Sequence, residues 1–205
     1  MKSFKDFFCS GNLQRDNFLS RLFGIFNEEI VHYWCQCPSS PYENLGRPSV
    51  YVKGEKQGHT LDFTFRHRGT GKVFIAEMKC ELSLDNYRYL ILEDARQLEH
   101  HLGKTAFQKF LQAAREPKSL EVWVGGRSGG TKVEIDGAIL ILGTTTLKGR
   151  EEVIEKYGLA DVLSLEAMLN ELLKNEPEEW LRRINQLCNW STELFRFLSG
   201  WERIN

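Results

Sequence analysis

Two carboxylates and one lysine on either side of a glycine-rich turn have the types and the spacing for metal-assisted phosphate chemistry. Two runs of alternating apolar residues flank Arg68-Gly69-Thr70-Gly71, and glycine favours a tight turn at such a position. A two-residue loop at Gly69-Thr70 or a four-residue loop from Arg68 to Gly71 places Asp62 directly across from Glu77. Lys79 follows Glu77 by two residues, so it projects from the same face of the predicted strand.

Directly opposed residues of paired strands hold their Cβ atoms about 4.5–5.5 Å apart, where two like charges destabilise a sheet. A cation between Asp62 and Glu77 would turn that repulsion into binding, and Mg²⁺ commonly takes one or two carboxylates. We therefore expect a Mg²⁺ site, in which Mn²⁺ would substitute, with Lys79 beside the metal. The alternative is a surface hairpin in which Lys79 pairs with Asp62 or Glu77. The opposite face is expected to be the core face, with Leu61, Phe63, Phe65, Phe74, Ala76 and Met78.

The set of Asp62 followed by Glu77-Met78-Lys79 on the next strand resembles the PD-(D/E)xK nuclease superfamily, which has the restriction-endonuclease-like fold. Leu61 stands where the family motif has proline. The resemblance implies metal-dependent hydrolysis of phosphodiester bonds, in which Asp62 and Glu77 bind the metal. Lys79 would orient or activate the attacking water. In the order of elements, the resemblance extends over about residues 17–142.

The resemblance implies a Mg²⁺-dependent endodeoxyribonuclease whose preferred partner is DNA. Two other functions are kept open. The first is a non-catalytic nucleic-acid-binding or assembly module that retains the nuclease fold, and the second is a metal-dependent phosphoesterase for small substrates. The complete set of Asp62, Glu77 and Lys79 argues against the non-catalytic module.

A helix is predicted from Asn17 to Trp34, because apolar residues recur there at helical spacing. Its buried stripe is expected to contain Phe18, Leu22, Ile25, Phe26, Ile30 and Tyr33. Glu29 falls inside that stripe, whereas Glu28 falls off it. A carboxylate on an apolar face needs a partner. In the resembled family a glutamate on the helix before the sheet often points at the metal, so we expect Glu29 to be a third metal ligand. The alternative is a structural arginine or lysine partner.

Four further residues are expected to assist the site or to bind substrate. Arg66 lies on the polar face of the predicted hairpin, and Arg68 lies in its turn. A helix is predicted from Asp85 to about Leu102, with Gln97 and His101 along one edge of its buried stripe. In the resembled family this helix often carries a glutamine near the active site, which Gln97 matches. His101 would donate to a phosphate or, as we favour, be solvated.

The order of predicted elements indicates one α/β domain over residues 1–175, with a mixed central sheet flanked by helices as in the restriction-endonuclease-like fold. Strands are predicted at 49–52, in the hairpin, at 120–124, at 137–142 and at 161–165, the last at an edge. The strand at 120–124 is expected to pair parallel with the Glu77 strand, because helices precede it as a crossover. Further helices are predicted at 105–115, 148–157 and 166–174.

Residues 176–205 are predicted to form a C-terminal amphipathic helix opened by Pro177. Its apolar side chains fall near one face, namely Trp180, Ile184, Leu187, Leu194, Leu198 and Trp201. Such a stripe packs on the domain, which is the default expectation, or forms the seam of a homodimer. A dimer would supply the two sites that cutting both strands of a duplex requires.

The formal net charge is −1 at pH 7, so the chain lacks the overall basic charge of a strong non-specific nucleic-acid binder. Basic residues nevertheless outnumber acidic ones by 7 to 4 over residues 46–82, which carry the predicted site. That local excess suits a phosphate-bearing substrate. The 5 cysteines form no regular framework and predict free thiols in a cytoplasmic protein. Neither a membrane-spanning run nor a secretory pattern is found, so no membrane partner is expected.

Overall fold

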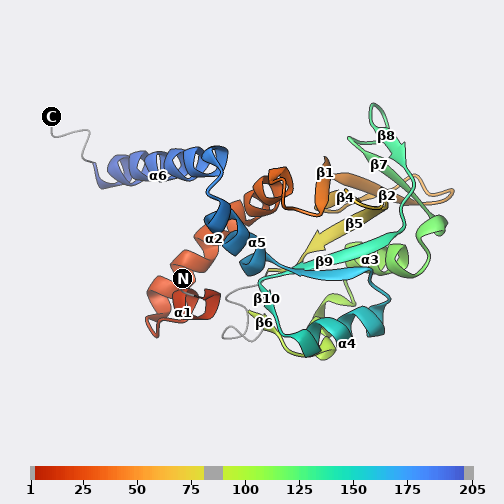
Figure 1. The fold of residues 1–205 in the computed structure, drawn as a ribbon, viewed down its shortest axis with the longest axis horizontal. Helices are drawn as coiled ribbons and strands as arrows, with labels where there is room; N and C mark the ends of the chain where they lie inside the picture. The colour runs from red at the N-terminus through yellow and green to blue at the C-terminus, as the bar shows by residue number, and fades with distance from the viewer. Residues whose placement is uncertain (1–2, 81–89, 201–205) are drawn as a thin grey trace.

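The computed structural model describes residues 3–80 and 90–200 and has a mixed α/β architecture (Figure 1). A five-stranded sheet with the order β1-β4-β5-β9-β11 forms its centre. Antiparallel pairing joins the first three strands, and parallel pairing joins β5 to β9 and β9 to β11. The strands are β1 (Tyr42–Gly46), β4 (Phe63–His67), β5 (Val73–Met78), β9 (Gly137–Leu142) and β11 (Asp161–Ser164).

A second, four-stranded antiparallel sheet has the order β3-β2-β7-β8. Its strands are β2 (Pro48–Val52), β3 (His59–Thr60), β7 (Leu120–Val124) and β8 (Thr131–Val133). The prediction that the strand at 120–124 lies parallel to the Glu77 strand is therefore wrong, because β7 pairs with β2. The neighbour of β5 is instead β9, whose 6 residues are all buried. A strand beside parallel neighbours needs cover on both faces, which β9 satisfies.

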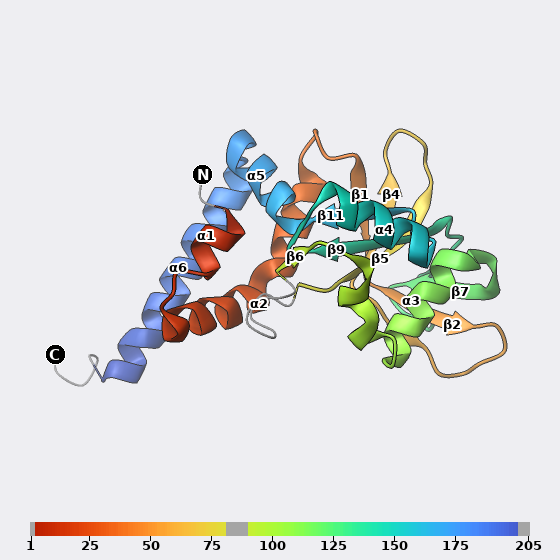
Figure 2. The ribbon, with the colours of Figure 1, turned by 90° about the horizontal axis from the view of Figure 1, so that it is seen from below.

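Helices cover both faces of the five-stranded sheet. One apolar cluster joins the sheet to α1 (Phe4–Phe8), α2 (Leu13–Gln36) and α5 (Leu165–Asn175). The other joins it to α3 (Thr105–Arg115) and α4 (Leu147–Tyr157). Side chains of β9 alternate between the two clusters, as the pleat of a strand requires. Figure 2 shows α1, α2 and α6 (Glu178–Ser199) at one end of the molecule and the hairpins of β2 and β4 at the other.

The face of the hairpin that carries Glu77 is more buried than the alternating pattern predicts. Thr64 and Ile75 on that face are fully buried, and Glu77 is nearly so. Leu61 packs in the α3 and α4 cluster rather than with Phe63, so it does not belong to the predicted core face. Burial of both faces follows from the helices on either side of the sheet. The carboxylate of Glu77 consequently lies in a low-dielectric environment.

The prediction of a helix from Asp85 to Leu102 is wrong for residues 90–102, which the structure describes. Asp85 itself lies outside the described residues. Residues 90–102 instead contain β6 (Ile91–Leu92), which pairs parallel with β10 (Thr144–Thr145), and a 3₁₀ helix η1 (Ala95–His101). Asp94 caps η1, and Gln97 closes the capping box.

The remaining helix and strand predictions agree with the structure at most boundaries. Helices α3, α4 and α5 occupy the predicted ranges within a residue or two, and β11 is an edge strand. Pro177 directly precedes α6, as predicted. One short helix, η2 (Pro117–Ser119), was not predicted. β1 was not predicted either, because turn residues surround it in the sequence.

All five cysteines are free thiols, which confirms the prediction. Their environments differ, and we expect their reactivities to differ with them. Burial raises the pKa of the Cys35 thiol from 9.0 to about 12, whereas Cys188 is exposed. At so high a pKa almost none of the Cys35 thiol is deprotonated near neutral pH, and the thiolate is the reactive form. In a native-state titration with a thiol reagent, Cys188 should therefore react first and Cys35 only after unfolding. Rapid labelling of Cys35 in the native protein would contradict this expectation.

Candidate active site

The hairpin of β4 and β5 places Asp62 level with Glu77. Phe63 lies opposite Ala76, and Phe65 lies opposite Phe74, which is the register predicted from the turn. The turn is the four-residue loop, because the His67 N–H donates to the Lys72 carbonyl at 2.8 Å. Asp62 directly precedes β4, and Glu77 is the second-last residue of β5. The two carboxylates therefore meet at the end of the hairpin remote from the turn.

Asp62 joins the two strands through its side chain. Its Oδ2 accepts a hydrogen bond from the Met78 N–H at 2.7 Å. Its other oxygen, Oδ1, lies 3.5 Å from Nη2 of Arg47. The backbone bond fixes the orientation of the carboxylate, and the side chain stays partly exposed. Asp62 thus presents one oxygen to the solvent-accessible side of the site.

Glu77 is buried and only partly satisfied. Its Oε1 accepts a close hydrogen bond from the Lys79 ammonium. Its Oε2 is buried and has no hydrogen-bond partner among the described residues. Burial raises the pKa of the Glu77 carboxyl, and the negative charge of Asp62 raises it further, while Lys79 offsets part of the rise. A buried carboxylate oxygen without a donor is costly, so a bound cation would satisfy it.

Lys79 completes the group one residue beyond the end of β5. Its backbone N–H donates to the Ile141 carbonyl of β9 at 2.8 Å, which extends the parallel pairing past Met78. Asp62, Glu77 and Lys79 line one open cavity of about 360 Å³. Asn27 and Lys104 line the same cavity. The structure therefore brings the three predicted catalytic residues together.

The expectation that Glu29 is a third metal ligand is corrected by the structure. Its carboxylate is bound by the guanidinium of Arg183 from α6, and this pairing lowers the pKa of Glu29. Glu29 therefore has the structural arginine partner that was the alternative to metal binding. Phe18 and Ile25 are 50% and 79% exposed, so the helix phase derived from them was wrong.

The buried stripe of α2 instead contains Phe23, Asn27, Ile30 and Trp34. Asp16, Ser20, Val31 and Cys35 are buried on the same side. At about 100° per residue, the mean direction of all these buried residues lies about 160° from Glu29 and about 100° from Glu28, so Glu29 is nearly opposite the stripe and Glu28 is at its edge. Glu28 lines the cavity of Asp62 and Glu77.

Arg47 connects Glu28 to Asp62. Its Nη2 lies 3.0 Å from Glu28 Oε1 and 3.5 Å from Asp62 Oδ1. The guanidinium therefore holds Glu28 of α2 beside Asp62. Four residues at the site are not predicted from the sequence, namely Arg47, Glu28, Asn27 and Lys104. A correct phase for α2 would have found Asn27 and Glu28, but no local pattern marks Arg47 or Lys104.

Gln97 and His101 lie near the site but are held by their own segment. The Gln97 side chain accepts from the backbone N–H groups of Glu93 and Asp94 and donates to the Ile91 carbonyl. His101 is buried against the ring of Phe107, with 5.3 Å between ring centroids, so the solvated reading of His101 is wrong. Both residues line a small cavity that Lys79 also borders. These contacts fix the segment that lies next to Lys79.

Arg66 and Arg68 point to other parts of the molecule. Arg66 pairs with Glu43 of β1, with 3.3 Å between Nη1 and Oε2. Arg68 donates from Nη2 to the Cys35 carbonyl at the end of α2, at 2.8 Å. Arg66 lies four residues along the strand from Asp62, or about 13 Å away. The structure does not bring either arginine to the carboxylates.

Within residues 3–80 and 90–200, no group of three or more histidine, cysteine, aspartate or glutamate side chains is arranged to hold a metal ion. The carboxylates that line the cavity are those of Asp62, Glu77 and Glu28, and Glu28 is paired with Arg47. Two carboxylates are a sufficient protein contribution for Mg²⁺, because this ion retains waters and binds phosphate oxygens of its substrate. The buried Oε2 of Glu77, for which the described part of the chain supplies no hydrogen-bond donor, suits such an ion.

No protein-family model, curated protein or solved structure matches this chain significantly. The geometry of the site is consequently the basis for any functional conclusion. In the part of the chain that the structure describes, no helix has the length and apolar character needed to cross a membrane.

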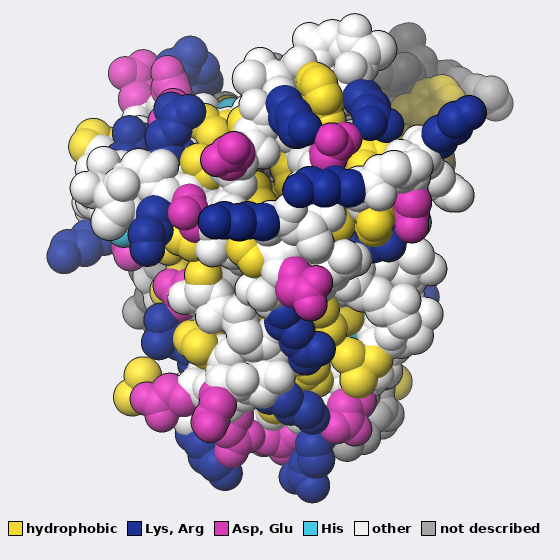
Figure 3. Space-filling model, turned by 90° about the vertical axis from the view of Figure 1, so that its right-hand side faces the viewer, with side chains coloured by type: hydrophobic (Ala, Val, Ile, Leu, Met, Phe, Trp, Pro, Cys, Tyr) yellow, Lys and Arg dark blue, Asp and Glu magenta, His cyan; other side chains and the backbone are white. Residues whose placement is uncertain are grey.

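Charges on the strand-bearing end of the molecule are mixed. Figure 3 shows lysine and arginine side chains interspersed with acidic ones over that face. Glu121 of β7, for example, pairs with both Arg127 and Lys132 at 2.9 Å. This face therefore lacks a uniformly basic surface, and the local cations at the carboxylate site are Lys79, Lys104 and Arg47.

Proposed function

We propose that this protein is a Mg²⁺-dependent nuclease that hydrolyses phosphodiester bonds in DNA at the site formed by Asp62, Glu77 and Lys79. The observation that carries the proposal is the buried Oε2 of Glu77, across from Asp62, which has no hydrogen-bond partner among the described residues. Two facing carboxylates with an ammonium beside them are a poor arrangement for stability alone, but they suit a cation and a phosphate. The PD-(D/E)xK superfamily, with its restriction-endonuclease-like fold, is part of the proposal. The mixed sheet supports it, because the hairpin carries the motif and β9 runs parallel to β5.

Each residue would have a separate role. The carboxylates of Asp62 and Glu77 would hold the cation, while the Met78 N–H keeps Asp62 oriented. Mg²⁺, when bound, supplies charge neutralisation at the phosphate and lowers the pKa of water. The Lys79 ammonium then shares its contact between Glu77 and the developing charge on the phosphate. Arg47, whose guanidinium lies 3.5 Å from Asp62, would donate to a phosphate oxygen of the substrate.

Cleavage assays with plasmid, linear and single-stranded DNA, each with Mg²⁺, Mn²⁺ or EDTA, test the proposal. We expect cleavage with either metal and none in EDTA. Asp62→Asn should lose both cleavage and the heat of Mg²⁺ binding in calorimetry, because the charge is removed while the acceptor for the Met78 N–H is kept. Asp136→Asn is the matched control, since Asp136 Oδ2 accepts from the Val73 N–H at the other end of β5, at 2.8 Å.

Different failures of this assay have different meanings. DNA binding without cleavage, in a parent protein that takes up no Mg²⁺, would indicate the non-catalytic module. Hydrolysis of free nucleotides but not of DNA would indicate the small-substrate phosphoesterase. Equal cleavage by Asp62→Asn and the parent would show that the carboxylate site is not the centre of reaction.

A further inference from the structure

A strip of α2 forms one wall of the cavity that holds Asp62 and Glu77. The strip consists of Gly24, Asn27 and Glu28, which are three and four residues apart and therefore lie on one side of the helix. Glu28 is paired with Arg47, so its place on this wall has a structural reason. The glycine and the asparagine, in contrast, are both unfavourable for the stability of α2 at their positions.

Asn27 places a buried amide on this wall without a partner. The residue is 8% exposed, and no hydrogen bond joins its side chain to another of the described residues. Phe23 and Ile30, one turn before it and one turn after it, are apolar and pack in the core. Burying an amide without a hydrogen bond is costly. A leucine would therefore suit the position better if stability alone determined the residue.

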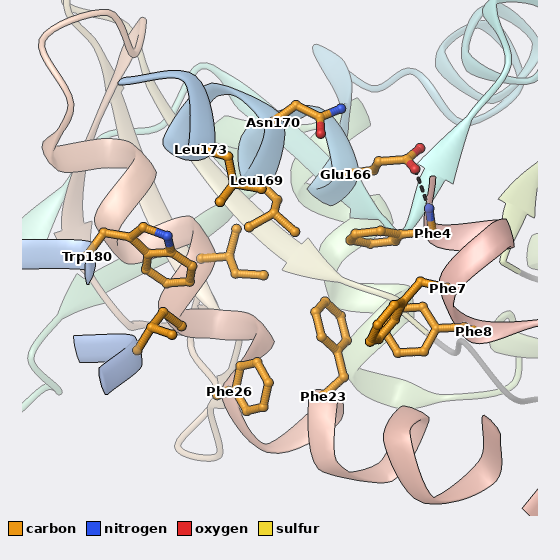
Figure 4. Close-up of a pocket in the computed structure, with 12 residues that line it drawn as sticks. Phe4, Phe7, Phe8, Phe23, Phe26, Glu166, Leu169, Asn170, Leu173 and Trp180 are labelled. Atoms are coloured by element: carbon orange, nitrogen blue, oxygen red, sulfur yellow. Dashed lines mark hydrogen bonds between the residues drawn. The ribbon is translucent and has the colours of Figure 1, made fainter. Parts of the chain in front are cut away.

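α2 also borders a second cavity, and its residues there are apolar. This cavity has a volume of about 350 Å³, and α2 lines it with Phe23, Phe26 and Ile30. Figure 4 shows the rings of Phe23 and Phe26 at its border, near Phe4 of α1. The helix thus presents large apolar side chains to the apolar cavity, and it presents a glycine, an amide and a carboxylate to the carboxylate cavity. The polar character of Asn27 matches the cavity that it lines.

Gly24 lies in the middle of α2, where glycine weakens a helix relative to alanine. It is not among the glycines with a positive φ, so the backbone does not require glycine at this position. A Cβ built on it would meet no atom from elsewhere in the described chain within 4 Å, so packing does not require glycine either. What the glycine provides is open space beside Asn27 on the wall of the cavity.

The charges at the cavity indicate an anionic ligand for the Asn27 amide. The carboxylates belong to Glu28, Asp62 and Glu77, and three cations lie beside them, namely Lys79, Lys104 and Arg47. Because these charges balance, a bound divalent cation would leave the cavity with a net positive charge. Lys104 is the N-cap of α3, whose first turn has no acidic residue, so the partial positive charge of the helix N-terminus adds to that of the lysine. An asparagine –NH₂ group donates to the oxygens of an anion such as phosphate.

We propose that Asn27 binds the substrate by donating from its side-chain amide to an oxygen of the phosphate at the carboxylates. Gly24 leaves the space for the nucleotide attached to that phosphate. This inference rests on the proposed nuclease function and adds a second element to its site. The hairpin of β4 and β5 supplies the ligands for the cation, and α2 supplies a donor and room for the substrate.

Asn27→Leu tests the role of the amide, since leucine removes both polar atoms at a similar size. For a duplex oligonucleotide with Mg²⁺, kcat/KM should fall by about 10- to 100-fold, the effect of losing one hydrogen bond to a charged group. The melting temperature should not fall, because no described residue loses a hydrogen bond. The heat of Mg²⁺ binding should be retained, in contrast to Asp62→Asn. Ser20→Ala is the matched control and should cleave at the parent rate, since Ser20 is another buried polar residue of α2 whose side chain has no hydrogen-bond partner in the described chain.

Two substitutions of Gly24 test the space beside Asn27. Gly24→Ala should raise the melting temperature, because alanine is the better helix former. Gly24→Leu should lower kcat/KM, mainly through a higher KM, because its side chain would occupy the place of the nucleotide. Gln14→Leu adds the same side chain at an exposed position of α2 outside the cavity and should keep the parent values.

The outcomes that overturn the inference are specific. A parent-like kcat/KM for Asn27→Leu would remove the role of the amide, and one for Gly24→Leu would remove the role of the space. A lower melting temperature for Asn27→Leu would assign the amide to the fold, and a loss of its Mg²⁺ heat would assign it to the cation.

DNA binding separates failure of this inference from failure of the nuclease proposal. If the parent does not cleave DNA, its binding to the same duplex, fluorescently labelled, is measured by anisotropy with Mg²⁺. Weaker binding by Asn27→Leu than by the parent and Ser20→Ala would support the substrate contact while the nuclease proposal fails. Equal binding by the three proteins, or no binding by the parent, would overturn the inference.

Discussion

Replacing Lys79 by alanine should lower the rate of DNA cleavage by about 10²–10³-fold, by analogy with the loss of one donor to a transition-state oxyanion. Folding and metal affinity should be largely retained, because the ammonium supplies no ligand oxygen. Its removal also takes away a positive charge in direct contact with Glu77, so Mg²⁺ affinity should rise if it changes. This separation of rate from metal binding distinguishes a catalytic lysine from a lysine that only pairs with a buried carboxylate.

The test is a paired measurement of cleavage rate and Mg²⁺ affinity for Lys79→Ala, Asp62→Ala and the parent. Asp62→Ala should lose both quantities together, in contrast to Lys79→Ala. Lys72→Ala is a suitable control, because Lys72 is an exposed lysine of the same hairpin, next to its turn. Cleavage by Lys79→Ala at the parent rate would leave only the structural role of the Glu77–Lys79 pair.

The hairpin and its carboxylates could be predicted because all the information is local. The turn at Arg68–Gly71 fixes the register, and the alternation of apolar residues then places Asp62 across from Glu77. Burial of Glu77 could not be read from the hairpin, because it depends on helices α3 and α4 far along the chain. The pattern therefore predicted the meeting of the charges but not the low-dielectric environment that gives Oε2 its unsatisfied state.

The errors have a common origin in partners that are distant in sequence. Glu29 was assigned to the metal because Arg183, which binds it, is 154 residues away on α6. β7 was assigned to β5 because the second sheet, in which β2 pairs with β7, leaves no local signal. In the segment of residues 90–102, helical spacing competes with the capping of a short 3₁₀ helix by Asp94 and with pairing to β10. Local periodicity predicted the helices that are amphipathic on one side and failed where a distant contact determines the structure.

Glu77→Gln should make the metal-free protein more stable at neutral pH while it abolishes metal-dependent cleavage. The raised pKa means that the folded state binds the Glu77 proton more tightly than the unfolded state does. Stability from that proton is present below the ordinary value of 4.5 and is lost as the pH rises through the raised pKa of the folded protein. At neutral pH the charged carboxylate is therefore unfavourable in the fold, and glutamine removes the charge with little change in shape.

Thermal melts in EDTA across the range from about pH 4 to about pH 8 would measure this effect. The melting temperature of Glu77→Gln should exceed that of the parent at neutral pH, and the difference should shrink as the pH falls into the acidic range. Excess Mg²⁺ should reverse the order, because the parent gains stability by binding the ion and the variant gains less. Glu134→Gln, at an exposed loop position, should leave the melting temperature nearly unchanged. A lower melting temperature for Glu77→Gln at neutral pH in EDTA would mean that the Lys79 contact outweighs burial and the charge of Asp62. The buried Oε2 of Glu77 would then no longer be an argument for a bound cation.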